Sequence, residues 1–186
     1  SSSVRSVLDV LTDVDDALRA AGLPFAFGGA IALGYATADP RGTVDLDINV
    51  FVDVDQAAHV LRSLPAGAAW DDDDVRLLAR DGQVRVHVDD VAVDLFLNTD
   101  RFHEEAARRA RHVPFRERTI AVLDPDDLAV FKTFFDRPKD WVDLESMVAA
   151  GSIHGTPVLR TLTQLLGDDD ERVQRFRRLV ETGSAF

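Results

Sequence analysis

The sequence contains no cysteine, which excludes disulfides, thiolate metal sites and a cysteine nucleophile. It also lacks any apolar run long enough to cross a membrane, and its first residues hold no apolar segment of signal-peptide length. We therefore expect a cytoplasmic protein with no membrane partner. Positive charge is scarce as well. The 33 acidic residues outnumber the 21 basic ones, and the formal net charge of −12 disfavours broad, nonspecific binding to nucleic acid.

Lysine is the scarcest of the basic residues, with only Lys132 and Lys139 in 186 residues. The apolar fraction is 46%, which is enough for a packed core and argues against disorder. A chain of this length is expected to form one domain, or one domain with a helical appendage.

The order of the expected elements predicts the fold class. Helical periodicity is expected at 4–22, 29–36, 53–64, 99–112, 124–135 and 137–151, with two more helices between 156 and 181. Strand patterns are expected at 24–27, 43–52, 83–90, 91–98 and 117–123, and residues 66–74 are expected to be a loop with solvated aspartates. This order predicts an α+β fold, with a mixed-sheet core over residues 1–123 and a C-terminal helical subdomain over 124–186.

The strand expected at 43–52 carries Asp45 and Asp47 on one face, because residues two apart in a strand point the same way. Two neighbouring carboxylates repel each other, and burying them unpaired is costly. One interpretation is a half-exposed strand with a solvated polar face. The other is a site for a divalent cation, and hard oxygen ligands at this spacing suit Mg²⁺.

A third carboxylate, Asp94, interrupts the apolar strand at 91–98. It either caps a loop at the strand end or lies beside Asp45 and Asp47 on a neighbouring strand. In the second case three carboxylates from two strands could hold two metal ions. Gly28 and Gly29 stand between a strand and a helix, where backbone N–H groups can approach phosphate oxygens closely. The Gly-Gly pair, the two aspartates one residue apart and the later single aspartate together indicate a phosphate and metal site much more specifically than any one of them does.

These motifs resemble the DNA polymerase beta-like nucleotidyltransferase superfamily, whose signature is Gly-Gly or Gly-Ser, then Asp-x-Asp, then a later single Asp. More narrowly, "GGAIALGYA…PRGTVDLDINV" and "FKTFFDRPKDWVDLE" resemble AbiEii-type toxins of toxin–antitoxin systems, including the mycobacterial MenT toxins. The resemblance covers roughly residues 27–145. It implies transfer of a nucleotide, with CTP or UTP favoured, to the 3′ end of tRNA. Pyrophosphate is released, aminoacylation and translation are blocked, and a cognate antitoxin protein is the expected partner.

The resemblance also implies roles for individual residues. Asp45, Asp47 and Asp94 match the Mg²⁺-binding carboxylates, and together with Lys132 they are the expected catalytic set. The nucleotide-binding positions implied by the motifs are Gly28, Gly29, Arg41, Lys132, Lys139, Asp140 and Asp143. From the residues alone, Lys139 and Asp140 could equally form a helix-end ion pair, and Lys139 and Asp143 have the spacing of an i,i+4 salt bridge.

An RNA acceptor needs a positive surface, and the best local candidate is the stretch that follows the strand bearing Asp94. Its arginines are Arg108, Arg109, Arg111, Arg116 and Arg118, accompanied by His103 and His112. The alternative is a solvated face whose arginines pair with nearby glutamates. A second cluster on the last expected helix comprises Arg172, Arg175, Arg177 and Arg178.

Two other functions fit parts of the pattern. Aminoglycoside and lincosamide nucleotidyltransferases also carry Gly-Gly and Asp-x-Asp, but act on small molecules and need no arginine patch. A noncatalytic binding partner of the same fold would be expected to lose carboxylates or Lys132. Thr37 and Thr43 flank the loop leading to Asp45, where a phosphate of roughly −1.5 to −2 charge would oppose Mg²⁺ and triphosphate binding. We therefore predict regulatory phosphorylation there.

Overall fold

The computed structural model describes residues 5–40 and 42–186. Its contacts divide the chain into two compact units, which are described separately below. The first unit holds residues up to 31 and from 41 to 123, and the second holds residues 32–40 and 124–186. Within the described residues, no helix is both long enough and apolar enough to span a membrane.

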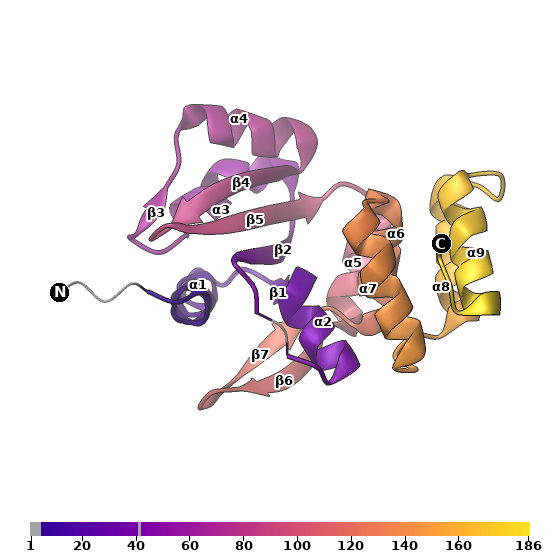
Figure 1. The fold of residues 1–186 in the computed structure, drawn as a ribbon. Coiled ribbons are helices and arrows are strands. Elements are labelled where there is room, and N and C mark those ends of the chain that lie inside the picture. The colour runs from indigo at the N-terminus through magenta and orange to yellow at the C-terminus, as the bar shows by residue number, and fades with distance from the viewer. Residues whose placement is uncertain (1–4, 41) are drawn as a thin grey trace. The chain divides into compact units, whose positions relative to one another are not determined.

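The first unit is built on a seven-stranded sheet with the order β3-β4-β5-β2-β1-β7-β6 (Figure 1). Two neighbouring pairs, β2 with β5 and β1 with β7, are parallel, and the others are antiparallel. The expected α+β class with a mixed sheet is confirmed. The strands are β1 (Phe25–Phe27), β2 (Asp45–Asp53), β3 (Ala68–Ala69), β4 (Gln83–Val88), β5 (Val91–Asn98), β6 (Arg111–Phe115) and β7 (Arg118–Val122).

Short helices pack against this sheet through apolar stripes. The helix α4 contacts β4 and β5, whereas α1 and α5 contact β2. In α1, Val10, Leu11, Val14 and Leu18 are fully buried, and Gly22 lies just beyond the helix end with a φ of +69°. The helical segments are α1 (Val7–Ala20), the 3-10 turn η1 (Val54–Gln56), α3 (Ala57–Arg62), α4 (Asp72–Asp81) and α5 (Arg101–Arg109). The helix α2 (Gly29–Thr37) begins in the first unit and continues into residues of the second.

The rest of the second unit is helical, with α6 (Pro125–Phe135), α7 (Pro138–Ala149), α8 (Gly155–Leu166) and α9 (Glu171–Thr182). Its core is formed by side chains that α6, α7, α8 and α9 turn toward one another, and Trp141 and Phe176 are the largest of those that are fully buried. Both α6 and α7 begin with proline in the first turn, where the missing N–H costs nothing.

Two sequence-based expectations about local structure were wrong. Part of the expected loop at 66–74 is β3 and the start of α4. Asp71 caps α4 by accepting from the Asp74 N–H, while the Asp74 carboxylate accepts from the Asp71 N–H. Asp71 and Asp74 stabilise the N-terminus of α4, and the composition of the segment alone did not predict this role. The helix expected at 99–112 ends at Arg109, because residues 111–115 pair with β7 as strand β6.

Candidate active site

The three predicted carboxylates lie on one face of the sheet, on the adjacent strands β2 and β5. The parallel register places Asp47 directly beside Asp94, and Asp45 beside Ala92. Leu46 and Ile48 point to the other face and are fully buried. The Asp45 and Asp94 side chains remain 34% and 21% exposed, so they are open to a ligand but partly desolvated. Strand register therefore brings the carboxylates together.

A fourth charged residue, Arg85 on β4, joins this face and was missed by the sequence-based reasoning. Its Nε and Nη2 donate to the two carboxylate oxygens of Asp94, each at 2.8 Å, and Nη2 also lies 3.3 Å from Oδ2 of Asp45. The hydrogen bonds with Asp94 and its negative charge raise the pKa of Arg85, and the charges of Asp45 and Asp47 add to the effect. Asp94 and Asp45 thus hold the Arg85 guanidinium in this structure.

A usable signal for Arg85 was present in the sequence. Asp89 and Asp90 form a two-residue turn with φ values of +48° and +70°, as two-residue hairpin turns of the primed type require. A turn of that length fixes the register of β4 against β5, and counting back from it places Arg85 opposite Asp94.

Gly28 and Gly29 lie against the same carboxylates. The Gly28 N–H donates to the Asp47 carbonyl oxygen at 2.9 Å. This hydrogen bond extends the pairing of the strands, so the Gly28 N–H is not available to a phosphate oxygen. Gly29 has a φ of +50°, and an ideal Cβ there would stand 2.7 Å from Asp47 Cγ. Only glycine fits so close to the carboxylate, and the chain turns from β1 into α2 at this point.

The chemistry of the residues present suits a divalent cation. Three carboxylates share one sheet face, Asp45 and Asp94 already hold a guanidinium, and the space beside Asp47 is kept clear by Gly29. Carboxylate oxygens of this kind are the ligands that Mg²⁺ prefers. Within residues 5–40 and 42–186, no group of three or more Asp, Glu or His side chains is arranged so that it could hold a metal ion as it stands. Holding the ion would therefore require the carboxylates to turn toward it.

Asn49 continues the row of Asp45 and Asp47 along β2, but it is buried, with 4% of the residue exposed. Among the described residues its Nδ2 has no hydrogen-bond partner. The alternation along β2 places Asn49 on the face of the aspartates, and the burial of this amide is a finding of the structure.

Four predicted or neighbouring residues form an ion cluster between α6 and α7 in the second unit. The Lys132 side chain is 8% exposed, and its Nζ lies 2.8 Å from Asp143 Oδ2 and 3.6 Å from Asp140 Oδ1. Asp140 is completely buried and accepts two hydrogen bonds from the Arg137 guanidinium, at 2.7 and 3.1 Å. The two carboxylates thus have partners other than the expected Lys139. The nucleotide-binding role of this cluster stays a prediction.

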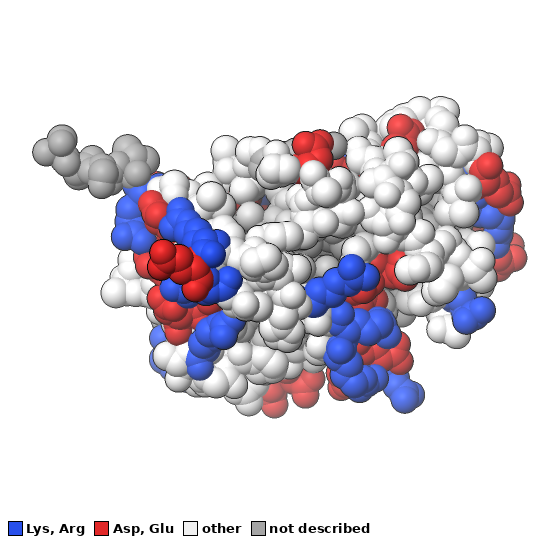
Figure 2. All heavy atoms as spheres, turned by 90° about the horizontal axis from the view of Figure 1, so that it is seen from below, with Lys and Arg blue, Asp and Glu red and all other residues white. Residues whose placement is uncertain are grey.

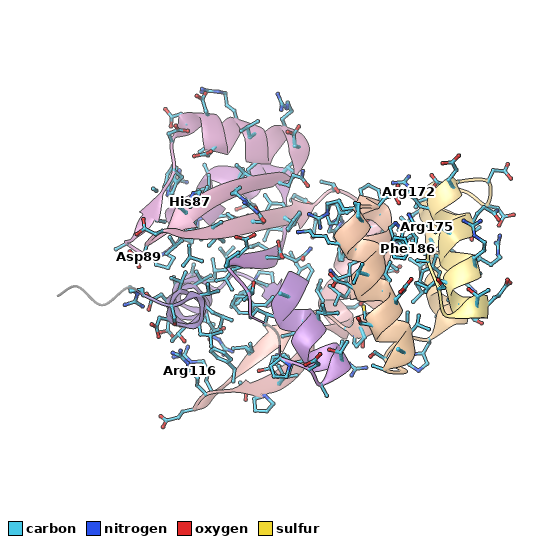
Figure 3. All side chains as sticks on the ribbon, viewed as in Figure 1. His87, Asp89, Arg116, Arg172, Arg175 and Phe186 are labelled. Carbon is cyan, nitrogen blue, oxygen red and sulfur yellow. The ribbon has the colours of Figure 1, made fainter. Side chains whose placement is uncertain are left out.

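The predicted arginine patch divides into two parts. Arg116, in the turn between β6 and β7, lies 3.1 Å from the Asp9 carboxylate on α1 (Figure 3). Arg118 lies 3.0 Å from Asp15 and 2.6 Å from Asp16. Their charges are largely compensated by α1, and an RNA would have to compete with these carboxylates.

The other arginines of the patch, Arg108, Arg109 and Arg111, are exposed around the end of α5. Arg109 lies 4.0 Å from Glu105, whereas His103 is buried and lies outside this surface. Figure 2 shows that on the face it displays, basic side chains stand next to acidic ones rather than forming one continuous basic field.

Two threonines were predicted as phosphorylation sites. The Thr43 hydroxyl donates to the Asp45 carbonyl oxygen at 2.7 Å and so shapes the entry to β2. The Thr37 hydroxyl bonds within its own helix, to the Leu33 carbonyl oxygen. Arg41, predicted to bind nucleotide, lies outside the described residues.

The second arginine cluster, on α9, is largely engaged. Arg172 pairs with Asp170, and Arg177 with Asp168. The Arg175 guanidinium lies between the rings of Trp141 and Phe186, 4.5 and 5.0 Å from their centroids (Figure 3). A shallow hollow of about 440 Å³ lies beside Arg172, Arg175 and Arg178, with Asp136 and Glu171 in its wall.

Comparisons with solved structures identify the fold of this chain. No protein-family model matches the sequence, and no curated protein matches it either. Among solved structures, the crystal structure of ANT(2″)-Ia in complex with adenylyl-2″-tobramycin is similar, with a TM-score of 0.54 and 14% identity. The alignment covers 94% of this chain and 97% of that one. The solution structure of the antibiotic-resistance factor ANT(2″)-Ia gives a TM-score of 0.52, 15% identity, and coverage of 94% and 91%.

The chain has the nucleotidyltransferase fold. A nucleotidyltransferase-like protein from Paracoccidioides brasiliensis is also similar, with a TM-score of 0.48, 15% identity, and coverage of 91% of this chain and 94% of that one. The similarity to the two ANT(2″)-Ia structures confirms the fold expected from the Gly-Gly and Asp-x-Asp motifs. The narrower likeness to the toxins stays a prediction.

Proposed function

We propose that this chain is a Mg²⁺-dependent nucleotidyltransferase that transfers a nucleotide, with CTP or UTP favoured, to the 3′ end of tRNA. The observation that carries the proposed chemistry is the shared sheet face of Asp45, Asp47 and Asp94, on a chain with the nucleotidyltransferase fold. In this proposal the modified tRNA can no longer be aminoacylated, translation stops, and a cognate antitoxin in the cytoplasm controls the enzyme.

The proposed reaction forms a bond between the acceptor hydroxyl oxygen and the α-phosphorus of the nucleotide and breaks the bond to pyrophosphate. Asp45, Asp47 and Asp94 would hold Mg²⁺, which supplies charge compensation for the triphosphate and acidifies the attacking hydroxyl when bound. Asp94, on the strand beside Asp45 and Asp47, would orient the acceptor hydroxyl and accept its proton. The α2 N-terminus after Gly29 offers backbone N–H groups to phosphate oxygens.

The support for an RNA acceptor is narrower than the sequence indicated. Arg116 and Arg118 are paired with carboxylates of α1, and the support now rests on the exposure of Arg108, Arg109 and Arg111. These three arginines belong to α5 and the start of β6, and α5 packs against β2 and β5, the strands that carry the carboxylates. A polyanion held by α5 would therefore lie on an element that is anchored to the catalytic strands.

A small-molecule acceptor is the second candidate. It is favoured by the similarity to ANT(2″)-Ia over almost the whole of both chains, because that structure is a complex with adenylyl-2″-tobramycin. The compensation of Arg116 and Arg118 also removes part of the argument for RNA. In this alternative the remaining arginines are a solvated face, and the enzyme confers antibiotic resistance.

Label transfer from each of the four NTPs to total tRNA and to an aminoglycoside panel separates the two acceptors. We expect tRNA labelling with CTP or UTP, and loss of all labelling in Asp47→Asn. Changing Arg108, Arg109 and Arg111 together to Glu should weaken tRNA labelling and flatten its salt dependence by roughly one slope unit or slightly less per lost contact.

The matched control changes Arg62, Arg76 and Arg80 to Glu. These exposed arginines on α3 and α4 give the same change in charge away from α5. Equal loss of tRNA labelling in both triple variants would mean that only overall charge matters. Labelling of an aminoglycoside but not of tRNA by the unmodified protein would overturn the RNA proposal.

A further inference from the structure

We propose that Arg85 is an internal counter-cation: it occupies Asp45 and Asp94 until a divalent cation displaces its guanidinium, which then binds substrate phosphate. The proposal rests on the proposed function, because it assumes that these carboxylates hold a metal during nucleotide transfer. It goes beyond that function by coupling metal binding to nucleotide binding through one side chain.

The geometry places the guanidinium on the ligand oxygens themselves. Both oxygens of Asp94 accept from Arg85 at 2.8 Å, and the same Nη2 reaches Asp45 Oδ2 at 3.3 Å. A metal ion bound by these oxygens would occupy the space in which the guanidinium lies. Two cations cannot share it, because like charges about 4 Å apart repel strongly near a protein surface.

Arg85 is also the member of this group that can leave. Asp45, Asp47 and Asp94 are short side chains on central strands of the sheet, whereas the Arg85 side chain is long, lies on β4 and is 52% exposed. Its neighbours on the same strand face, Gln83 and His87, are exposed as well. The guanidinium can therefore rotate into solvent without disturbing the packed face of the sheet.

The displaced guanidinium would have a natural new partner. Guanidinium groups bind phosphate through paired hydrogen bonds, much as Arg85 binds the Asp94 carboxylate here. A nucleotide brought to Asp45 and Asp47 carries phosphate oxygens within the neighbourhood of β4. Metal binding would free Arg85 for the nucleotide, and by linkage the nucleotide would favour the metal-bound state.

The simplest alternative is that Arg85 only holds the carboxylates in place for the metal. The two roles predict opposite effects of Arg85→Ala on the binding of Mn²⁺ alone, measured by electron paramagnetic resonance without nucleotide. A counter-cation predicts that Mn²⁺ binds about twofold to fivefold more tightly, the range expected for losing a competing, half-exposed ion pair. A positioning role predicts weaker binding. Arg85→Lys, which keeps the charge but loses the planar fork, should lie between the unmodified protein and Arg85→Ala.

Arg80→Ala is a matched control. Arg80 also grips a carboxylate through two hydrogen bonds, to Asp81 at 2.7 and 2.9 Å, and it is exposed on α4. This variant loses the same charge and the same type of ion pair as Arg85→Ala. Because the carboxylate partner of Arg80 is Asp81 and not a proposed metal ligand, the affinity for Mn²⁺ should stay unchanged. If Arg80→Ala and Arg85→Ala raised the affinity for Mn²⁺ equally, the loss of one positive charge would explain both results, and the proposal would be overturned.

The second arm measures binding of the non-hydrolysable α,β-methylene analogue of CTP by calorimetry, with and without saturating Mn²⁺. With Mn²⁺, Arg85→Ala should bind the analogue about fivefold more weakly than the unmodified protein, whereas without Mn²⁺ the two should bind alike. An equal loss in both conditions would overturn the proposed coupling.

An Asp45→Asn, Asp47→Asn double variant separates this inference from the proposed function. If Mn²⁺ binding depends on these aspartates but is no tighter in Arg85→Ala, only the inference fails. If no variant and no unmodified protein binds Mn²⁺, the proposed metal site and the inference fail together.

Discussion

Replacement of Gly29 by alanine tests whether the Asp47 carboxylate must stay where the structure places it. Two costs are expected, and they can be separated. The first is conformational, because φ is +50° at Gly29 and a residue with a Cβ pays about 1 kcal/mol or somewhat more in the left-handed region. The second is steric, because the new Cβ would stand 2.7 Å from Asp47 Cγ and 3.0 Å from Asp47 Cβ.

The size of the steric effect follows from these distances. Carbon atoms pack at about 3.5–4.0 Å, so the Asp47 carboxylate would have to move by about 1 Å. Metal ligands tolerate only about 0.2 Å, and a misplacement of about 1 Å in a catalytic site can cost 10²-fold in rate. We therefore expect nucleotide transfer by Gly29→Ala to fall by about 100-fold, with the free energy of unfolding lowered by about 1–2 kcal/mol.

Gly22→Ala provides the matched control. Gly22 has a similar φ of +69°, but nothing lies within 4 Å of the position of its missing Cβ. The Gly22→Ala variant should lose about 1 kcal/mol of stability and keep its full transfer activity. Pyrophosphate release with CTP or UTP and tRNA gives the rates, and urea unfolding gives the stabilities. If Gly29→Ala transferred nucleotide within about threefold of Gly22→Ala, the position of Asp47 would not matter for catalysis and the site assignment would be refuted.

Three further predictions concern charge. Lys132→Met should lower the free energy of unfolding by about 3 kcal/mol, because it removes the ammonium that pairs with Asp143 and Asp140 in a largely buried cluster; a change confined to nucleotide affinity would instead make Lys132 a triphosphate ligand. Hydrogen bonds from the Arg172 side chain, and then from its backbone N–H, lower the pKa of Asp170 to about 2, below its unfolded value near 3.9. The stability difference between the unmodified protein and Asp170→Asn should therefore be full above about pH 4 and vanish as the pH falls through about 2, and urea unfolding across this range would show whether it does. Thr43→Glu should reduce transfer, because it adds negative charge that repels the incoming triphosphate, and undiminished transfer would argue against phosphorylation control.

The sequence predicted most of the first unit because its strands alternate clearly and its turns have specific chemistry. Asp45, Asp47 and Asp94 could be assigned to two strands from local patterns. Their alignment could not, since a parallel register between β2 and β5 is set by distant segments. The run Asp71 to Asp74 predicted a loop wrongly, because an acidic run has the composition of a loop and its reciprocal capping of α4 shows only in the structure.

The pairing of charged side chains was the property that the sequence predicted least well. All five arginines between 108 and 118 were equal candidates from their spacing, although β6 and β7 bring Arg116 and Arg118 to the acidic residues of α1, about a hundred positions away. Spacing rules likewise favoured Lys139 as the partner of Asp143, whereas Lys132 reaches it from the preceding helix. Contacts between elements decide such pairs, and no local pattern reports them.

The place of β2 in the strand order has a consequence for how the chain folds. The hairpin of β4 and β5 closes through a two-residue turn, and local hairpins form within microseconds, about 1–10 μs. β2 instead fits between β5 and β1, and its pairing with β5 is non-local and therefore slow. Asp94 is paired with Arg85 as soon as the hairpin closes, so β2 docks Asp47 beside an ion pair rather than beside a bare carboxylate. On this account the guanidinium screens the electrostatic repulsion that would otherwise oppose the last step of sheet assembly.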